Sequence, residues 1–225
     1  MSRVAITTDR FDLAAPPYSA LGLDPVPVPC IRVEPADAEV LASARAAASD
    51  ADLILITSPR TVELLWSDRD MPGVDVAAVG KVTAVAIADA GGKVVATGQG
   101  GLPGLVETVA GRLSRARVVY PHGSRPDPVA LQRLRALAPT LDERVIYRTA
   151  PIAPAPALVD AVVFASPSAV AGWLLTRDFG ALVVGVIGST TGAAVARRRA
   201  PDVIASEPSH PALARALITY LEVRV

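Results

Sequence analysis

The sequence predicts an α/β protein made of two parallel-sheet domains that are related by an internal duplication and joined by a two-stranded linker. Residues 51–65 (ADLILITSPRTVELL) and 159–174 (VDAVVFASPSAVAGWL) share one plan, in which an apolar run precedes a Ser-Pro pair and a helical pattern. Such a run is typical of a strand buried on both faces of a sheet. A spacing of 108 residues separates Ser58 from Ser166, Gly80 from Gly188, Thr83 from Thr191 and Pro103 from Pro211. This constant spacing at strand-to-helix turns indicates a duplication.

Strand and helix patterns alternate along the chain, which is typical of parallel sheets covered by helices. We expect strands over residues 4–8, 52–57, 74–79, 93–97, 117–120, 143–149, 161–164, 183–187 and 203–205. We expect helices over residues 37–48, 82–90, 103–113, 128–138, 191–199 and 211–221, and one after each Ser-Pro pair. Ser58 and Ser166 are expected to be N-caps, because the proline after each suits the first helical position. In the first of the listed helices, Val40 and Leu41 are expected on one face.

Two segments interrupt this alternation. Pro16 and Pro17 break the segment 9–23, so that any helix there is short or begins at Pro17. Residues 25–35 (PVPVPCIRVEP) alternate valine and proline. This pattern predicts an extended linker or an edge strand, because proline cannot donate a hydrogen bond to a central ladder.

The domain organisation follows from the position of the linkers, since each comes after the first strand-helix unit of its copy. Two extended linkers can pair as an antiparallel hinge, and the opening unit of each copy would then join the remainder of the other copy. The expected boundaries are residues 1–27 with 150–225 for a discontinuous domain, 35–142 for an inserted domain, and 28–34 with 143–149 for the hinge strands. A single division at residue 115 is the plainer alternative.

Composition excludes several classes of protein. The 22 basic and 22 acidic residues give a net charge of zero, which does not favour a nucleic-acid or anionic-membrane partner. The single Cys30 offers neither a disulfide framework nor a metal cluster. No apolar segment approaches the roughly 20 residues of a membrane-spanning helix, and no apolar signal region precedes the first strand. We therefore expect a cytoplasmic monomer that binds no metal.

The turns at the carboxyl ends of the strands are the expected ligand sites of an open α/β sheet. They are rich in Gly, Ser and Thr and poor in charge: TSPRT (57–61), GKVT (80–83), GQGG (98–101), PHGS (121–124), ASPSA (165–169), GSTT (188–191) and SEPS (206–209). Backbone N–H groups at helix starts, together with hydroxyls, bind carboxylates or phosphates without a basic cluster. The ordinary alternative is that these residues only cap helices and form turns.

Other chemistries find little support in the sequence. The loop GQGGLP (98–103) has Pro103 where a dinucleotide fingerprint needs glycine, so we expect a simple turn. His122 and His210 are far apart in sequence and have no metal-ligand neighbour at a recognised spacing. Neither a phosphate loop nor a nucleophile elbow is present. The arginine run at 197–199 is expected on a solvated helix face.

A set of motifs then carries a family resemblance: ITSPRTVELL, AAVGKVTAVAIADAGGKV, VVYPHGSRPDPVALQRL, ERVIYRTAP, VVFASPSAVAGWL, and VIGSTTGAAVA followed by SHPALARAL. Through these motifs, which span roughly residues 50–220 in this order, the chain resembles the uroporphyrinogen-III synthase family. The resemblance implies two α/β domains joined by a two-stranded linker, with the N-terminal strand in the C-terminal domain.

The resemblance also implies a cofactor-free lyase of porphyrin and heme biosynthesis. Its substrate would be hydroxymethylbilane, a linear tetrapyrrole with eight carboxylates. Loss of the terminal hydroxyl and attack by ring D would give a spiro intermediate, which recloses with ring D inverted to uroporphyrinogen III. Because pyrrole nitrogens supply the electrons, the protein mainly needs to fold the chain and hold ring D.

Site residues follow from the same resemblance. Tyr147 matches the family tyrosine near the leaving hydroxyl, while from the residues alone it reads equally well as a half-buried linker aromatic. The positions that match substrate contacts are Ser58, Thr83, Ser166 and Thr191, with Ser168, Gly188, Ser189 and Arg10 beside them.

The N-terminal turn departs from the family pattern of Thr-Arg-Pro followed by a full helix. Here the chain reads Thr-Thr-Asp-Arg-Phe from Thr7 to Phe11, and a proline-broken segment follows. Asp9 would be unfavourable if it faced a polycarboxylate, and Arg10 replaces the family arginine. The alternative is therefore an inactive two-lobed protein of the same fold that binds tetrapyrroles or other polyanions.

Overall fold

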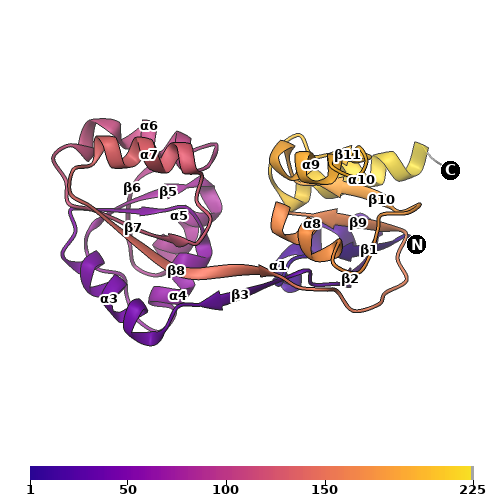
Figure 1. Ribbon diagram of the computed structural model, residues 1–225, viewed down its shortest axis with the longest axis horizontal. Coiled ribbons are helices and arrows are strands. Elements are labelled where there is room, and N and C mark those ends of the chain that lie inside the picture. The colour runs from indigo at the N-terminus through magenta and orange to yellow at the C-terminus, as the bar shows by residue number, and fades with distance from the viewer. Residues whose placement is uncertain (224–225) are drawn as a thin grey trace. The chain divides into compact units, whose positions relative to one another are not determined.

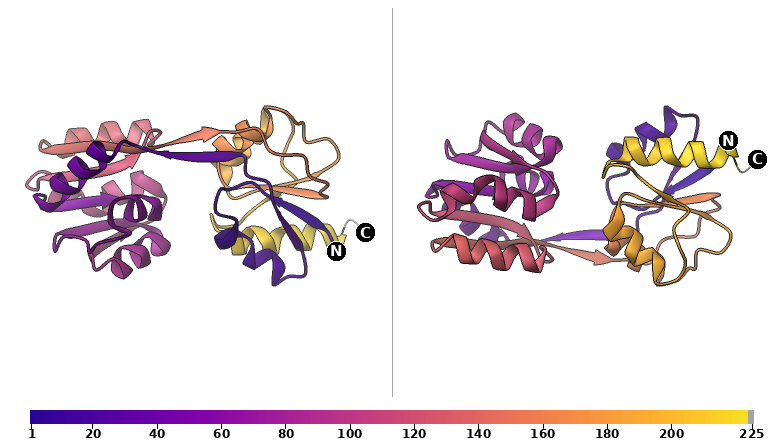
Figure 2. Two further views of the ribbon diagram at one scale, coloured as in Figure 1. Left: turned by 90° about the horizontal axis from the view of Figure 1, so that it is seen from below. Right: turned by 90° about the horizontal axis from the view of Figure 1, so that it is seen from above.

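The computed structural model describes residues 1–223 and divides the chain into two compact units. Unit 1 comprises Met1–Val33 with Thr149–Val225, and unit 2 comprises Glu34–Arg148. Figure 1 shows helices and strands in both units, and Figure 2 shows the N-terminal strand and the C-terminal helix in the same unit. The predicted α/β class with parallel sheets is confirmed.

The sheet of unit 2 contains β3 (Ile31–Pro35), β4 (Leu53–Ile56), β5 (Asp75–Val79), β6 (Lys93–Gly98), β7 (Val118–Gly123) and β8 (Leu141–Pro151). Their order across the sheet is β3-β8-β7-β4-β5-β6. The pairs from β8 to β6 are all parallel. All four side chains of β4 are fully buried, and each contributes about 1.5–3 kcal/mol through its burial. The apolar run of the sequence thus became the central strand.

Helices cover both faces of this sheet: α3 (Ala38–Ser49), α4 (Pro59–Trp66), α5 (Gly80–Asp89), α6 (Gly101–Leu113) and α7 (Pro128–Leu137). Figure 1 shows α6 and α7 on one face and α3 and α4 on the other. Two separate apolar clusters fill the two interfaces. One contains buried residues of α6 and α7, and the other contains buried residues of α3, α4 and α5.

The sheet of unit 1 contains β1 (Arg3–Ile6), β2 (Asp24–Pro27), β9 (Ala161–Phe164), β10 (Val183–Val186) and β11 (Val203–Ile204). Their order is β11-β10-β9-β1-β2, with every pair parallel. Strand β1 is hydrogen-bonded to β9, so a division of the chain at residue 115 would separate two neighbouring strands of one sheet. The five strands repeat the order of β6-β5-β4-β7-β8 in unit 2.

Unit 1 has five helices in the described residues: α1 (Phe11–Ala14), α2 (Pro16–Ser19), α8 (Pro167–Trp173), α9 (Ser189–Ala196) and α10 (His210–Val223). Residues of α1, α2 and α10 pack into one apolar cluster. Residues of α8 and α9 pack into a second cluster with Val28 and Cys30. The sheet is therefore covered on both faces, as in unit 2.

Strands β3 and β8 carry the chain from one unit to the other. The backbone N–H of Ala36 donates to the carbonyl of Ile146 at 2.9 Å, and the N–H of Ile152 donates to the carbonyl of Cys30 at 2.9 Å. The earlier residue of the first segment, Cys30, pairs with the later residue of the second, so the two strands run antiparallel. Gly172 lies against them, because a Cβ there would come within 1.9 Å of the Cys30 carbonyl oxygen.

Local details differ from what the sequence patterns suggest. Val40 lies one turn before the buried Ala44 and two turns before the buried Ala48, on the same face of α3, yet in the first turn of this helix it is 39% exposed. The helix expected at 82–90 begins two residues earlier, at Gly80, whose φ of +71° only glycine adopts readily. Arg197 and Arg198 are exposed as expected, but they follow α9 instead of lying in it, and Arg199 is half-buried with its Nη2 donating to the carbonyl of Leu182 at 2.6 Å.

The proline-broken segment and the glycine loop behave as expected. The segment after β1 holds two helices of four residues each, and the second begins at Pro16. In the glycine loop, Gly100 and Gly101 have φ values of +74° and +77°, and α6 begins at the second of them. The loop is therefore a turn into a helix.

Candidate active site

The carboxyl edge of each sheet gathers the residues that the sequence singled out. In parallel sheets the strands end on the same side, so the turns that follow them share one edge. The edge of unit 2 carries Ser58, Thr83 and Tyr147, and the edge of unit 1 carries Arg10, Ser166, Ser168, Gly188, Ser189 and Thr191. The candidate site residues therefore form two sets, one in each unit.

Ser58 and Ser166 act as helix caps. The hydroxyl oxygen of Ser58 accepts from the N–H of Arg60 at 3.3 Å, and that of Ser166 accepts from the N–H of Ala169 at 3.2 Å. A serine that accepts in this way still has its O–H to donate. The cap accounts for the serine in both places, and the remaining donor is available to an acceptor such as a carboxylate.

Thr83 and Thr191 lie in the first turn of α5 and in that of α9, and both side chains are 3% exposed. Within residues 1–223, neither hydroxyl has a hydrogen-bond partner, and neither oxygen is fully enclosed. A buried threonine normally bonds its hydroxyl to the protein or to water. The pair thus presents two unused hydroxyls at equivalent places in the two units.

Gly188 and its neighbours form the turn before α9. The φ of Gly188 is 176°, an extended value open to any residue, and a Cβ there would meet nothing within 4 Å. Neither the backbone nor the packing of the protein therefore requires glycine at this position. Ser189 is exposed and Ser168 half-buried beside this edge.

The N-terminal turn of unit 1 is held by hydrogen bonds of Thr7 and Thr8. Thr7 is 1% exposed, and its hydroxyl donates to the carbonyl of Val163 at 2.7 Å. The N–H of Arg10 donates to the hydroxyl of Thr8 at 3.3 Å, so that Arg10 precedes α1 in a half-buried position. Asp9 beside it is exposed to solvent.

Unit 2 holds a buried polar group that sequence reasoning missed. The rings of Tyr120 and His122 stack with centroids 4.4 Å apart, and the Tyr120 hydroxyl lies 3.4 Å from Oγ1 of Thr57. Burial raises the pKa of Tyr120 to about 12 and lowers the pKa of His122. His122 Nδ1 lies 2.7 Å from the carbonyl oxygen of Gly123, whereas its buried Nε2 has no partner among the described residues.

His210 of unit 1 is paired instead. Its Nδ1 lies 3.1 Å from the hydroxyl of Tyr18, and burial lowers the pKa of His210. In the described part of the chain, no group of three or more His, Cys, Asp or Glu residues could hold a metal ion. Over the same residues, no helix combines the length and the apolar character needed to cross a bilayer.

Tyr147 is half-buried on β8, next to the last residue of β7. Its backbone carbonyl accepts from the N–H of Ser124 at 3.0 Å. The phenol hydroxyl has no hydrogen-bond partner within residues 1–223. A tyrosine with a free hydroxyl at this edge can act as a donor to a bound ligand.

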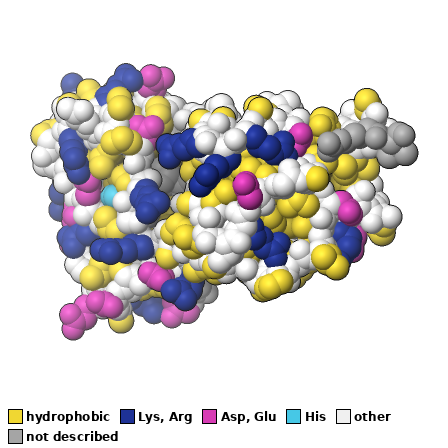
Figure 3. Space-filling view, turned by 45° about the vertical axis from the view of Figure 1, so that its right-hand side comes forward, with side chains coloured by type: hydrophobic (Ala, Val, Ile, Leu, Met, Phe, Trp, Pro, Cys, Tyr) yellow, Lys and Arg dark blue, Asp and Glu magenta, His cyan; other side chains and the backbone are white. Residues whose placement is uncertain are grey.

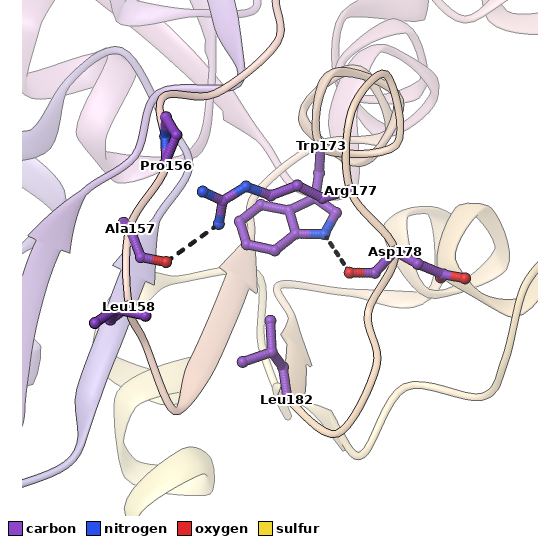
Figure 4. Close-up of a pocket in the computed structure, with 7 residues that line it drawn as sticks. All are labelled: Pro156, Ala157, Leu158, Trp173, Arg177, Asp178 and Leu182. Carbon is purple, nitrogen blue, oxygen red and sulfur yellow. Dashed lines mark hydrogen bonds between the residues drawn. The ribbon is translucent and has the colours of Figure 1, made fainter.

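A pocket of about 440 Å³ in unit 1 lies away from these residues (Figure 4). The guanidinium of Arg177 lies 4.9 Å from the ring centroid of Trp173 and donates to the carbonyls of Ala155 and Ala157. The residues of this pocket precede β9, end α8, or lie between α8 and β10, which places it at the amino edge of the sheet. Because Arg177 is already hydrogen-bonded to the protein, we interpret its role as structural: it fixes the proline-rich segment that precedes β9.

The surface charges agree with the net charge of zero. On the face shown in Figure 3, Lys and Arg side chains are interspersed with Asp and Glu. Some ion pairs join neighbouring elements of the fold. Asp75, for example, receives both Lys93 at 2.7 Å and Arg112 at 2.6 Å, and both lower its pKa.

Comparison with known families decides the identity of this arrangement. The model of the family described as uroporphyrinogen-III synthase HemD matches residues 14–215, which is most of the chain. The chain belongs to the uroporphyrinogen-III synthase family. This family consists of enzymes of tetrapyrrole synthesis, so the two hydroxyl-rich edges belong to an enzyme that acts on a small molecule.

Solved structures show the same fold at low sequence identity. A uroporphyrinogen-III synthetase from Helicobacter pylori has 16% identity and a TM-score of 0.68, and the alignment covers 99% of each chain. A mutant uroporphyrinogen III synthase from the extremely thermophilic bacterium Thermus thermophilus has 18% identity and a TM-score of 0.63, with 99% of this chain and 100% of that chain covered. No curated protein matches the chain.

Proposed function

We propose that the protein closes hydroxymethylbilane with inversion of ring D and so acts as a uroporphyrinogen-III synthase. The observation that carries this proposal is the family match over residues 14–215. The hydroxyl-rich edges of both units support it, because a substrate with eight carboxylates needs many donors rather than one strong base.

In the proposed reaction, the terminal hydroxyl of the substrate takes up a proton and leaves as water. The adjacent pyrrole nitrogen supplies the electrons, which gives an electrophilic azafulvene. The substituted carbon of ring D attacks it and forms the spiro intermediate. The bond from this carbon to its original bridging methylene then breaks, and the free carbon of ring D attacks that methylene and loses a proton. The products are uroporphyrinogen III and one water, and no oxidant, reductant or cofactor is consumed.

Tyr147 is proposed to donate to the leaving hydroxyl. Its phenol is half-buried and free of partners within the described residues. Hydrogen bonding from the phenol favours proton uptake by the departing oxygen, and the proton that ring D loses at closure balances the proton taken up. The role needs only this one donor, because the pyrrole nitrogens provide the driving force.

The remaining site residues are proposed to bind substrate carboxylates. The unused hydroxyls of Thr83 and Thr191 are the best placed for this, since each is buried and unpaired within the described residues. Ser58 and Ser166 can each donate their O–H while they cap a helix. The other proposed contacts are Ser168, Ser189, the open backbone at Gly188, and Arg10.

The test is the isomer ratio of uroporphyrinogen formed from freshly prepared hydroxymethylbilane, with and without the protein. We expect the type III isomer with the protein and the type I isomer, which forms spontaneously, without it. A folded protein that yields only type I would contradict the proposal. Binding of the substrate without turnover would then identify an inactive member of the family. Size-exclusion chromatography and cell fractionation test the further proposal of a cytoplasmic monomer.

A further inference from the structure

The pairing of β7 with β8 is irregular next to Tyr147. From Val118 to His122 the two strands pair residue by residue, and His122 lies opposite Val145. The next pair is Gly123 with Tyr147, so that Ile146 is an extra residue on β8. This arrangement is a β-bulge, a feature that commonly re-aims a side chain beside an active site.

The bulge changes the face that Tyr147 presents. Consecutive side chains of a regular strand point to opposite faces of the sheet. Ile146 and Tyr147 are consecutive, yet both pack against the apolar cluster formed with α3, α4 and α5. In a regular strand Tyr147 would share a face with Val145, which is 45% exposed. The extra residue therefore brings the phenol ring to the face of the sheet that α3, α4 and α5 cover.

Gly123 provides the space that the ring occupies there. A Cβ at Gly123 would lie 2.6 Å from Cε2, 2.7 Å from Cζ and 3.0 Å from the hydroxyl oxygen of Tyr147. The φ of Gly123 is not in the left-handed region, so its backbone conformation does not require glycine. The ring of Tyr147 is thus the contact that excludes a side chain at this position.

Hydrogen bonds hold both sides of this contact. The N–H of Ser124 donates to the Tyr147 carbonyl at 3.0 Å, and the N–H of Ala36 donates to the Ile146 carbonyl at 2.9 Å. On the other strand, His122 Nδ1 lies 2.7 Å from the carbonyl oxygen of Gly123. The backbone under the ring is therefore fixed by its neighbours, and a methyl group there would have to displace the ring.

We propose that Gly123 is a positioning residue: together with the bulge at Ile146, its bare Cα seats the ring of Tyr147 in the orientation used for donation to the leaving hydroxyl. The proposal rests on the proposed function of Tyr147. It predicts that adding a single methyl at Gly123 is equivalent, for the reaction, to removing the phenol hydroxyl.

The kinetic test compares Gly123→Ala, Tyr147→Phe and the double variant in the conversion of hydroxymethylbilane to the type III isomer. We expect both single variants to lower kcat by a similar factor, with KM changed less than about twofold, and the double variant to be no slower than the slower single variant. The matched control is Gly111→Ala, where a Cβ meets nothing within 4 Å and kcat should not change. If the fold-decrease in kcat of the double variant equals the product of the two single decreases, the proposal is overturned.

A second measurement follows the ring itself, without reference to activity. In NMR spectra of protein labelled at its four tyrosines, the signal lost in Tyr147→Phe identifies the ring of Tyr147. We expect Gly123→Ala to shift this signal and Gly111→Ala to leave it in place; an unchanged signal in Gly123→Ala would overturn the proposal. If the wild-type protein yields only the type I isomer, the proposed function fails, while the spectrum still decides whether Gly123 seats the ring.

If Gly123→Ala does not fold, the variant that combines it with Tyr147→Leu decides. Removing the ring gives the added methyl room, so recovery of the folded state would support a direct contact between Gly123 and the ring of Tyr147. An unfolded double variant, beside a folded Tyr147→Leu, would overturn it because the methyl would then clash with something else.

Discussion

The carboxyl edges of the two units are alike on one side and different on the other. In both, a serine caps the helix after the central strand, and a threonine that is 3% exposed lies in the first turn of the next helix. On the other side of the central strand, unit 2 carries the aromatic residues Tyr120 and Tyr147 on β7 and β8. In unit 1 the corresponding strands are β1 and β2. Two helices of only four residues each, α1 and α2, connect them.

Under the proposed function, this difference predicts different roles for the two units. The shared side offers neutral hydroxyls, which can bind carboxylates but cannot drive the loss of water. Among the described residues, only unit 2 has at its carboxyl edge a phenol without a hydrogen-bond partner, whereas the equivalent turn of unit 1 uses Thr7 internally, on the carbonyl of Val163. We therefore expect variants in unit 2 to affect turnover and variants on the shared side to affect binding in both units.

The largest expected effect is on turnover in unit 2. Tyr147→Phe should lower kcat roughly 100-fold, because a positioned proton donor typically contributes at least that factor. Tyr18→Phe in unit 1 is the matched control, since Tyr18 is fully buried against His210 and should leave kcat unchanged. Steady-state formation of the type III isomer measures both, and equal losses in the two variants would contradict different roles for the two units.

A smaller effect is expected on substrate binding, and it should appear in both units. Thr83→Val and Thr191→Val remove only the unpaired hydroxyl, so each should raise KM about tenfold, as expected for one hydrogen bond to a charged group. The value of kcat should stay within about twofold, because the loss of a carboxylate contact that is equally strong in the ground state and the transition state changes KM alone. A rise in KM for only one of the two variants would show that the threonines do not share this role.

The caps should affect stability by similar amounts in the two units. Ser58→Ala and Ser166→Ala should each lower the free energy of unfolding by about 1 kcal/mol, and the glycine variants by only a few tenths. The chain carries a reporter for each, because Trp66 lies in α4 and Trp173 in α8, one in each unit. Urea titrations of variants that retain only one tryptophan measure the unfolding of each unit separately. If a cap variant lowers the unfolding free energy only of the unit that carries the substitution, the two units unfold independently.

The smallest effect concerns pH. Burial lowers the pKa of both histidines from about 6.5, so the unfolded chain binds protons first as the pH falls. Stability is therefore full above the unfolded pKa and decreases on acidification until the folded pKa is reached. His122→Gln and His210→Gln should each flatten the dependence of the unfolding free energy on pH below the ordinary histidine pKa of about 6.5. Slopes equal to that of the wild type would show that the histidines do not cause the dependence.

The sequence by itself determined the fold class and the contents of the two edges. Apolar runs, Ser-Pro caps and glycine stops are local patterns, since each depends on residues within about one turn of one another. Ser58 and Ser166 cap helices as expected, and the proline-broken segment gave only short helices. The family resemblance added the reaction and Tyr147, which local patterns alone left as an ordinary linker aromatic.

Tertiary structure decided which way the important side chains face. Val40 is 39% exposed although the helix spacing places it on one face with the buried Ala44 and Ala48, and Arg199 donates to a carbonyl 17 residues away. The orientation of Tyr147 depends on a one-residue register shift and on a glycine of another strand. Such contacts join segments that are distant in sequence, and strand register is set by packing over the whole sheet, so no local pattern encodes them.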